Sequence, residues 1–400
     1  MFLAYRFRLL PSKRQHRVLE SILESQRQLY NAALQERIDC YIKTGKSISC
    51  RAQFRSLTTC RRELPEMAAI PVKLQRWTLA QLDGAFQGFF RRLKVRKEKA
   101  GYPRFRGIRG WNSFGFADCT GIQFDCKRLY FKGMSSGLKV HVHRKLPKNA
   151  DVRSCVFRRD LDGWFISFQI AEETNKKDKI STAIGVDLGL NVFAYCSNGY
   201  EIPNPRIARK AEKEMRRRQR ALARCKRGSK RRQKVCKKLS KLHQKIVNTR
   251  TTWLHQKSIE LVNNVDLIAV EDLNVRGMLK HPKLARSIQD VSWSKFLSML
   301  EYKAEKAGVR FIRVDPKHTS QKCSGCGKLV PKSLAVRIHS CPHCGLVINR
   351  DYNASRNILQ AGLMRAGLSA EWLTWPSGAS VHSETRTVSQ CVNPLSYGVC

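Results

Sequence analysis

The sequence predicts an α/β chain of several domains, and three observations lead to that prediction. A strand-like segment opens the chain, a helical region follows, and a group of strand-like segments covers residues 113–171. Further on, short apolar runs rich in β-branched residues alternate with helical patterns, as expected of a sheet covered by helices. A pair of Cys-x-x-Cys motifs interrupts this second half. We therefore expect a β-barrel interrupted by a helical bundle, followed by an α/β domain with a small metal-binding insert.

The helical region near the N-terminus predicts a bundle. Residues 2–10 alternate apolar and basic side chains, the pattern of a half-exposed strand. Ser12 opens a capping box, and apolar residues then recur at helical spacing as far as Gly45. Two more helices are predicted at about residues 50–62 and 72–99. Their basic faces suit either a solvated bundle or one that contacts a phosphate backbone.

Residues 101–106, Gly-Tyr-Pro-Arg-Phe-Arg, end the helical pattern. Aromatic rings between arginines can stack on bases while the guanidinium groups bind phosphates, or they can pack in a turn against the core. The sequence favours neither interpretation. The residues that follow, 113–171, include a predicted hairpin at Asp162 and Gly163, and they predict a small β-barrel that the N-terminal strand completes.

The second half predicts a sheet with acidic side chains at the ends of its strands. Residues 182–202 predict three strands, with Asp187 at the end of the first and a turn at residues 198–199. Glu271 ends the next buried apolar run. This strand order and the position of the first acid match an RNase H-like sheet.

Residues 206–250 are the most basic stretch of the chain. Clusters of arginine and lysine are opposed there by Glu212 and Glu214 alone. Apolar residues recur between the charges, so we expect a helical hairpin that turns near residues 228–229 and lies along a polyanion, rather than a disordered tail.

Three carboxylates far apart in the sequence form the candidate catalytic set: Asp187, Glu271 and Asp351, the last at the start of a predicted helix. A carboxylate at the end of a buried strand points into the crevice where ligands bind in α/β folds. Three acids brought together repel one another unless a cation neutralises them. Oxygen ligands without histidine suit magnesium or manganese, and two such ions can hydrolyse a phosphodiester.

The two Cys-x-x-Cys motifs predict a structural zinc site. Their cysteines are Cys323, Cys326, Cys341 and Cys344, and a glycine follows each pair. Four thiolates at this spacing suit tetrahedral zinc, and a redox couple is the weaker interpretation because both pairs share one module. His339 and His343 lie close by but are not needed as ligands.

Composition indicates the partner and the compartment. The net charge of the 400 residues is +45, which requires a polyanion, and nucleic acid is favoured over a membrane surface. No apolar run reaches the roughly 18 residues of a membrane span, and the N-terminus lacks the apolar core of a signal peptide. The 15 cysteines are mostly scattered singly, which favours a reducing cytosol over a disulfide framework.

Together these motifs resemble the TnpB family, proteins of bacterial insertion sequences that are related to type V CRISPR effectors. The similarity extends from about residue 2 to 361, and five short motifs in the same order and spacing carry it. They are residues 101–106, 185–189, 270–274, 319–323 and the pair 344–345 with 350–354.

The resemblance implies the domain layout. A WED-like β-barrel would comprise residues 1–10 and 101–175, interrupted by a REC-like helical domain at 11–100. A RuvC-like nuclease domain would comprise 180–318 and 348–366, with the zinc insert at 319–347 between its parts. Residues 367–400 would form a variable, disordered tail with no assigned role.

The resemblance also implies the function, and a location in the bacterial cytosol in association with the nucleoid. The chain would be an RNA-guided DNA endonuclease of a transposable element that binds a guide RNA with its scaffold and cuts double-stranded target DNA beside a short flanking motif. Asp187, Glu271 and Asp351 would hold two magnesium ions. The alternatives are a guide-dependent DNA-binding regulator that does not cut, a RuvC-like nuclease that needs no RNA, and a structural RNA-binding protein, which would leave the three acids without a purpose.

Overall fold

The computed structural model describes residues 1–95, 100–134, 136–147, 150–174, 180–333 and 335–368. Residues 369–400 of the predicted C-terminal tail and the last residues of the predicted third helix lie outside these ranges. The chain divides into two compact units, Met1–Glu173 and the residues from Thr174 onward. Each unit has its own hydrophobic core.

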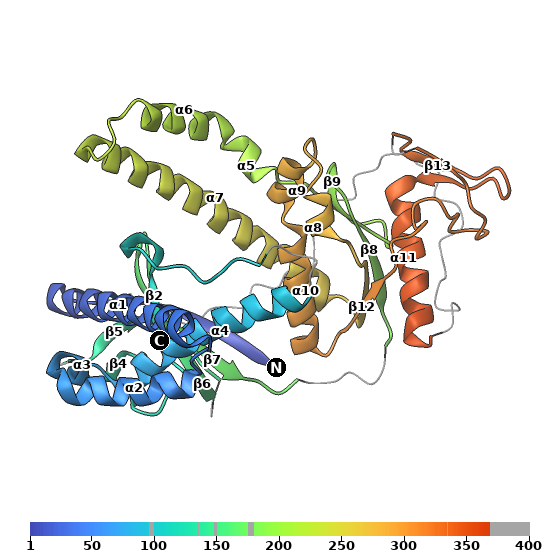
Figure 1. Ribbon diagram of the computed structural model, residues 1–400. Coiled ribbons are helices and arrows are strands. Elements are labelled where there is room, and N and C mark those ends of the chain that lie inside the picture. Colours follow the sequence, from blue (N-terminus) through green and yellow to red (C-terminus); the bar gives the residue numbers. More distant parts are fainter. Residues whose placement is uncertain (96–99, 135, 148–149, 175–179, 334, 369–400) are drawn as a thin grey trace. The chain divides into compact units, whose positions relative to one another are not determined.

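The first unit contains a seven-stranded sheet and four α-helices (Figure 1). Its helices are α1 (Lys13–Thr44), α2 (Cys50–Glu63), α3 (Pro65–Ala69) and α4 (Val72–Val95), with a 3₁₀ turn at Ile108–Gly110. Its strands are β1 (Phe2–Leu10), β2 (Ser113–Phe116), β3 (Ile122–Phe124), β4 (Arg128–Phe131), β5 (Leu138–His141), β6 (Asp151–Asp160) and β7 (Gly163–Ala171).

The N-terminal strand lies in the middle of this sheet. The strand order is β2-β6-β7-β1-β5-β4-β3, so β1 joins the long β6–β7 hairpin to the shorter strands. The sheet curls, because Phe116 near one end of this order contacts Phe131 near the other, with ring centroids 5.9 Å apart. The predicted hairpin is present, with Asp160 paired to Gly163 across the turn.

The helices pack on the sheet and on one another through α1. Ser12 and Gln15 form the predicted capping box, and Gly45 ends the helix in the left-handed conformation, at φ 67°. The first half of α1 contributes Leu19 and Leu23 to the core of the sheet. Its second half packs on α2 and α4, where buried Arg37 forms an ion pair with Asp83 at 2.9 Å.

The second unit contains a five-stranded sheet with helices on both faces (Figure 1). Its strands are β8 (Ala183–Leu188), β9 (Val192–Cys196), β10 (Glu201–Pro203), β11 (Leu267–Glu271) and β12 (Arg310–Val314). Its helices are α5 (Ile207–Lys210), α6 (Glu212–Ala223), α7 (Lys230–Asn263), α8 (Val275–Met278), α9 (Ala285–Val291), α10 (Trp293–Ala307) and α11 (Arg350–Ala366). A two-stranded ribbon, β13 (Ile338–Ser340) and β14 (Val347–Asn349), precedes α11.

The order of the main sheet is β10-β9-β8-β11-β12. The first three strands are antiparallel neighbours, whereas β8, β11 and β12 run parallel. One face packs on α7 and α10 and the other on α11. The basic residues between β10 and β11 form the predicted helical hairpin, α6 and α7, which turns at Gly228 with φ 84° and at the helix cap Ser229.

Candidate active site and metal centre

The first two acids lie on the same face of the sheet, at the ends of adjacent parallel strands. Side chains alternate between the faces of a strand. Ile184 and Val186 belong to the core on the α7 and α10 side, so Asp187 lies on the α11 side. Glu271 lies on that side too, since Ala269 packs against α11. Val270 pairs with Val186, so the next residues along the two strands, Glu271 and Asp187, lie next to each other where this pairing ends.

Helix α11 contacts this face closely because two glycines leave room for it. A Cβ atom on Gly185 would stand 2.1 Å from the backbone oxygen of Ser355, and one on Gly362 would stand 2.4 Å from the Cβ of Ala269. Real Cβ atoms essentially never approach other atoms so closely. The helix therefore lies directly on β8 and β11, in a position that any side chain at Gly185 would change.

This packing places Asp351, in the first turn of α11, near the other two acids. The Asn349 side chain caps the helix by accepting the Asp351 backbone N–H at 2.8 Å. Burial raises the pKa of Asp187 well above its ordinary value, and the neighbouring carboxylates of Glu271 and Asp351 raise it further. The structure thus brings together the three acids that the sequence predicted as a catalytic set.

Two residues that the sequence analysis did not single out contact these acids. The Thr319 hydroxyl donates a hydrogen bond to Oε1 of Glu271. Burial raises the pKa of Glu271, and this hydrogen bond opposes the rise. Arg337 Nη1 lies 3.9 Å from Oδ1 of Asp351. Thr319 belongs to one of the five family motifs, so the sequence could have indicated its importance. Arg337 lies between the cysteine pairs, outside any motif, and no sequence pattern indicated it.

The three acids have the chemistry of a divalent cation site. All of their ligand atoms are carboxylate oxygens, the set that magnesium and manganese prefer. Burial and the neighbouring charges of Glu271 and Asp351 raise the pKa of Asp187, and a bound cation would offset both effects.

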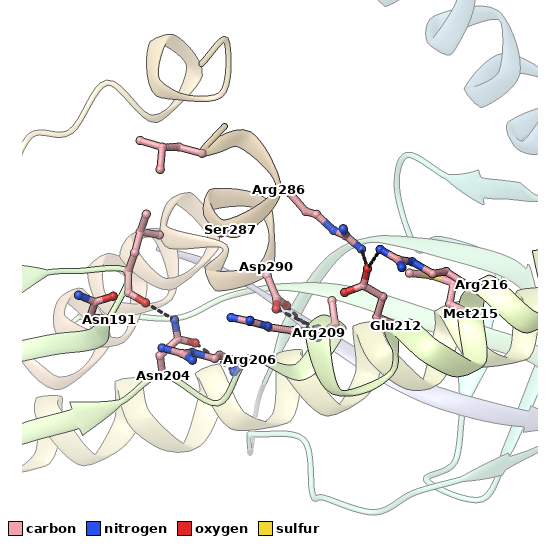
Figure 2. A pocket seen from close by; sticks show the side chains of 13 residues that line it. Asn191, Asn204, Arg206, Arg209, Glu212, Met215, Arg216, Arg286, Ser287 and Asp290 are labelled. Atoms are coloured by element: carbon pink, nitrogen blue, oxygen red, sulfur yellow. Dashed lines mark hydrogen bonds and ion pairs between the residues drawn. The ribbon is translucent and has the colours of Figure 1, made fainter. Parts of the chain in front are cut away.

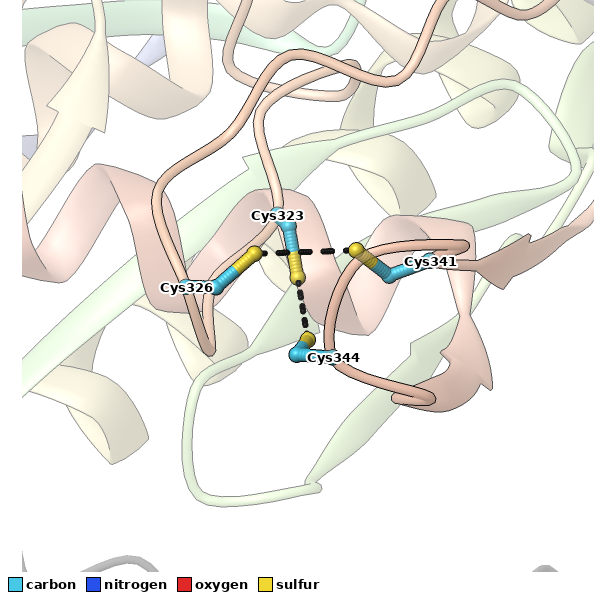
Figure 3. A group of neighbouring side chains, drawn as sticks. All are labelled: Cys323, Cys326, Cys341 and Cys344. Atoms are coloured by element: carbon cyan, nitrogen blue, oxygen red, sulfur yellow. Dashed lines mark hydrogen bonds between the residues drawn. The ribbon is translucent and has the colours of Figure 1, made fainter.

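The four cysteines form a tighter group (Figure 3). The sulfur atoms of Cys323, Cys326, Cys341 and Cys344 all lie within 4.8 Å of one another. The Cys323–Cys344 and Cys326–Cys341 sulfur pairs are each 3.6 Å apart. Sulfur atoms at 2.3 Å from a tetrahedral zinc ion stand about 3.8 Å apart. The cluster therefore has the size of a closed four-thiolate zinc site, and neither nearby histidine belongs to it.

Both cysteine pairs have the same backbone structure. The N–H of the first cysteine of each pair bonds to a carbonyl five residues later: Cys323 to Lys328 and Cys341 to Leu346, both at 2.9 Å. The glycine after each pair, Gly327 or Gly345, has φ of 74° or 72°, which a residue with a side chain rarely adopts. These glycines let each loop fold tightly around its two thiols.

Helix α11 also anchors the cysteine module. Asn353 accepts the backbone N–H of Ser324 at 2.9 Å and donates to the Lys322 carbonyl at 2.8 Å. Asn357 donates to the carbonyls of Thr319 at 2.7 Å and Lys322 at 2.6 Å. Both asparagine side chains are buried. One helix therefore packs on the sheet, carries Asp351 and fixes the module beside the acids.

A separate cavity of about 610 Å³ lies among β9, β10, α5, α6 and α9 and is rich in arginine (Figure 2). Arg216 and Arg286 both form ion pairs with Glu212. Arg206 and Arg209 are both exposed, and among the described residues their guanidinium groups form no ion pair, although the backbone N–H of Arg209 donates to Asp290 at 3.4 Å. The cavity thus presents cations that are free to bind phosphate groups.

The aromatic and basic segment at residues 101–106 packs one of its rings against the helical core, while base stacking by its other ring stays a prediction. The Tyr102 ring packs edge-on against Phe86 and Phe89, with centroids 5.5 and 5.2 Å away. The Asn31 side chain accepts the backbone N–H of Arg106 and donates to the Arg106 carbonyl oxygen. Phe105, between two arginines, is 54% exposed and can accept a stacked base.

Comparison with known proteins identifies the family. A protein named "Putative RNA-guided DNA endonuclease" from Streptomyces pristinaespiralis is 31% identical over 370 residues, covering 90% of this chain and 89% of that protein. The chain belongs to the TnpB family. The TnpB relative InsQ of Escherichia coli K12, also named a putative RNA-guided DNA endonuclease, is 27% identical and covers 90% of this chain and 92% of its own length.

Family models match three TnpB regions. They are described as "Probable transposase" at residues 166–281, "Cas12f1-like, TNB domain" at 293–358 and "Helix-turn-helix domain" at 1–46. In this structure the last region is not a helix-turn-helix, because residues 1–46 form strand β1 and the single long helix α1. The second region contains the cysteine module and the start of α11.

A solved structure shares the TnpB fold. The Cas12f1 chain of a complex with single-guide RNA and target DNA has a TM-score of 0.57 at 16% sequence identity. The match covers 87% of this chain and 83% of that one. At this identity the likeness concerns the fold alone.

None of the described helices combines the length and hydrophobicity that crossing a bilayer requires.

Proposed function

We propose that this chain is an RNA-guided DNA endonuclease of a transposable element, which cuts double-stranded DNA by metal-dependent hydrolysis of phosphodiester bonds. The observation that carries the proposal is the convergence of Asp187, Glu271 and Asp351 on the α11 face of the sheet, in a chain of the TnpB family. A regulator that only binds DNA has no use for three gathered acids, two of which raise the pKa of the third, Asp187.

The acids would act as ligands of two magnesium or manganese ions. Bound there, the ions would activate a water molecule and stabilise the departing 3′ oxygen of the cleaved strand. A carboxyl group binds a cation in its ionised form, and a bound cation would offset the charges of Glu271 and Asp351 that raise the pKa of Asp187. Arg337, at 3.9 Å from Asp351 and 55% exposed, can turn from the acid to a DNA phosphate.

The four cysteines would hold a structural zinc ion. Such a site has no open position for substrate and contributes folding free energy. Here that contribution would fix the loop at residues 319–324 against α11, beside the acids.

The domain layout follows the same proposal. The order β10-β9-β8-β11-β12, with the first acid on β8, supports an RNase H-like RuvC domain at residues 180–318 and 348–366 around a zinc insert at 319–347. Residues 1–10 and 101–175 would form the WED-like barrel, and 11–100 the REC-like helical domain.

Base pairing with the guide would supply the sequence specificity. The protein would hold the RNA–DNA duplex by its backbone, as other RNA-guided nucleases do. The basic hairpin α6 and α7, the arginine-rich cavity and Phe105 are the candidate contacts. A net charge of +45 suits a protein that binds both RNA and DNA.

The test is to purify the chain from its cells, sequence the RNA that copurifies, and present DNA complementary to the guide. Wild type should cut this DNA, and Asp187→Ala should bind it equally well but cut at least about 10³-fold more slowly. If both proteins bind and neither cuts, the chain is a guide-dependent regulator. If ribonuclease treatment leaves cutting unchanged, it is a nuclease that needs no RNA.

A further inference from the structure

The loop that leads from the sheet into the cysteine module returns to the acids. Val314, the last residue of β12, pairs with Glu271 in the ladder. The chain then turns at His318, which adopts a left-handed conformation with φ 59°. This turn brings Thr319 back to the Glu271 side chain, where its hydroxyl donates to Oε1. The contact engages one of the two carboxylate oxygens of Glu271.

Thr319 is fixed from its other side by buried amides. The Asn357 side chain donates to the Thr319 carbonyl at 2.7 Å and to the Lys322 carbonyl at 2.6 Å. Asn353 donates to the same Lys322 carbonyl at 2.8 Å and accepts the N–H of Ser324, which follows the first cysteine of the cluster. Hydrogen bonds thus join Glu271 to Thr319, Thr319 to α11, and α11 to the residues on either side of Cys323.

We propose that Thr319 is a positioning residue for Glu271, and that the cysteine cluster sets the divalent-cation affinity of the acids through it. The inference rests on the proposed function only in taking the acids as cation ligands. Thr319 would act through Glu271, by fixing the orientation of a carboxylate that would bind the cation. Partners of this kind change metal affinity about 10–100-fold when they are removed.

A merely local role for Thr319 predicts different behaviour. The same hydroxyl lies 3.1 Å from the carbonyl of Pro316, so it could simply stabilise the turn. In that case its loss would lower thermal stability or zinc content and leave the cation affinity of the folded protein unchanged. The two roles therefore separate when affinity, zinc content and unfolding temperature are measured on the same variants.

The variants are chosen to remove the hydroxyl without changing much else. Thr319→Val keeps the shape and loses the donor, while Thr319→Ser keeps the donor. The chain offers a matched control at the opposite end of the same strands, where the Thr182 hydroxyl donates to Oδ2 of Asp266 at 3.0 Å. Thr182→Val removes the same kind of bond far along the strand from the acids.

The experiment measures Mn²⁺ binding by electron paramagnetic resonance, on the full-length, zinc-loaded chain freed of nucleic acid. Asp187→Ala gives the background of ions bound elsewhere. Above that background, Thr319→Val should bind Mn²⁺ at least about 10-fold more weakly than wild type. Thr319→Ser and Thr182→Val should bind like wild type, and all three should keep their zinc.

Wild-type affinity in a folded, zinc-loaded Thr319→Val would overturn the inference, as would a Thr319→Ser variant no better than Thr319→Val. Should Thr319→Val lose its zinc, the smaller Thr319→Ala is read in the same way, and loss of zinc there too means a structural role. Guided DNA cleavage is scored in parallel. Cleavage by wild type decides the proposed function, whereas the Mn²⁺ affinities decide the role of Thr319.

Discussion

The cysteine cluster and the acidic centre both lie beside the N-terminal part of α11, but their ligands differ in kind. Four sulfur atoms lie within 4.8 Å of one another, at the size of a zinc tetrahedron. The acidic centre offers carboxylate oxygens instead, and burial together with the charges of Glu271 and Asp351 raises the pKa of Asp187. The difference distinguishes a closed thiolate site, which suits zinc, from a carboxylate site, which suits magnesium or manganese.

The largest expected effect comes from breaking the closed site. Cys341→Ser removes one of four thiolates, and structural zinc contributes on the order of 10 kcal/mol to the folding of its module. We expect the variant to lose its zinc, measured by mass spectrometry, and with it guided DNA cleavage. Cys236→Ser, an exposed cysteine outside the cluster, should keep both. Zinc retained at the wild-type level in Cys341→Ser would contradict a four-thiolate site.

The second prediction concerns the packing of α11, the helix that both sites share, against strand β8. Gly185→Ala places a Cβ atom 2.1 Å from the Ser355 carbonyl oxygen and 2.6 Å from the Leu359 nitrogen, so α11 must shift. We expect a loss of about 3 kcal/mol of stability, seen as a lower unfolding temperature, together with loss of cleavage.

The control is Gly84→Ala, on an exposed part of α4 with no atom within 4 Å of the new Cβ. It should raise stability by about 0.5–1 kcal/mol, because alanine favours a helix. A neutral Gly185→Ala would mean that the helix does not lie as closely on the sheet as described.

The sequence predicted the site residues whose positions follow from local or periodic patterns, and it missed those that reach the site through loops. Asp187 and Glu271 could be predicted because strand alternation and parallel pairing place side chains by simple rules. The cysteines could be predicted because their ligand spacing is local. Thr319 and Arg337 reach the acids through loops, whose course depends on the φ of His318 and on buried amides of α11. No periodic pattern encodes such contacts.

The same limits apply to the fold. The capping box at Ser12, the turn at Gly199 and the basic hairpin were predicted and are present. The short helices α3, α8 and α9 were not predicted, since each has too few residues to show a helical period. The central position of β1 between β5 and β7 also depends on contacts far apart in the chain.

The third prediction concerns the raised pKa of Asp187 in the acidic centre. A carboxyl group whose pKa is raised on folding destabilises the folded state as pH rises through and above its ordinary pKa. The penalty grows by up to about 1.4 kcal/mol per pH unit until the raised pKa is passed. With divalent ions removed, Asp187→Asn should therefore be more stable than wild type at neutral pH, and similar to it near pH 3.

Urea unfolding at several pH values measures this difference. Adding Mg²⁺ should stabilise wild type and leave Asp187→Asn nearly unchanged. A stability difference that is independent of pH would mean that Asp187 ionises normally in the folded chain.

The smallest effect concerns the arginine side chains of the cavity, which lies apart from both metal sites. Arg209→Ala removes a cation without an acidic partner among the described residues, whereas Arg286→Ala removes one already paired with Glu212. Both change the net charge equally. We expect the salt dependence of RNA binding, the slope of log K against log salt concentration, to fall by about 1 for Arg209→Ala and by less for Arg286→Ala. Equal slopes would remove the cavity from the RNA-binding surface.

The most direct measurement of the central claim is anomalous X-ray scattering at the manganese edge, from crystals of the full chain soaked in Mn²⁺. The account predicts peaks on the α11 face of the sheet, at bonding distance from Asp187, Glu271 and Asp351, and their disappearance in Asp187→Ala. Well-ordered carboxylates with no manganese peak among them, in a protein that still cuts DNA, would contradict it.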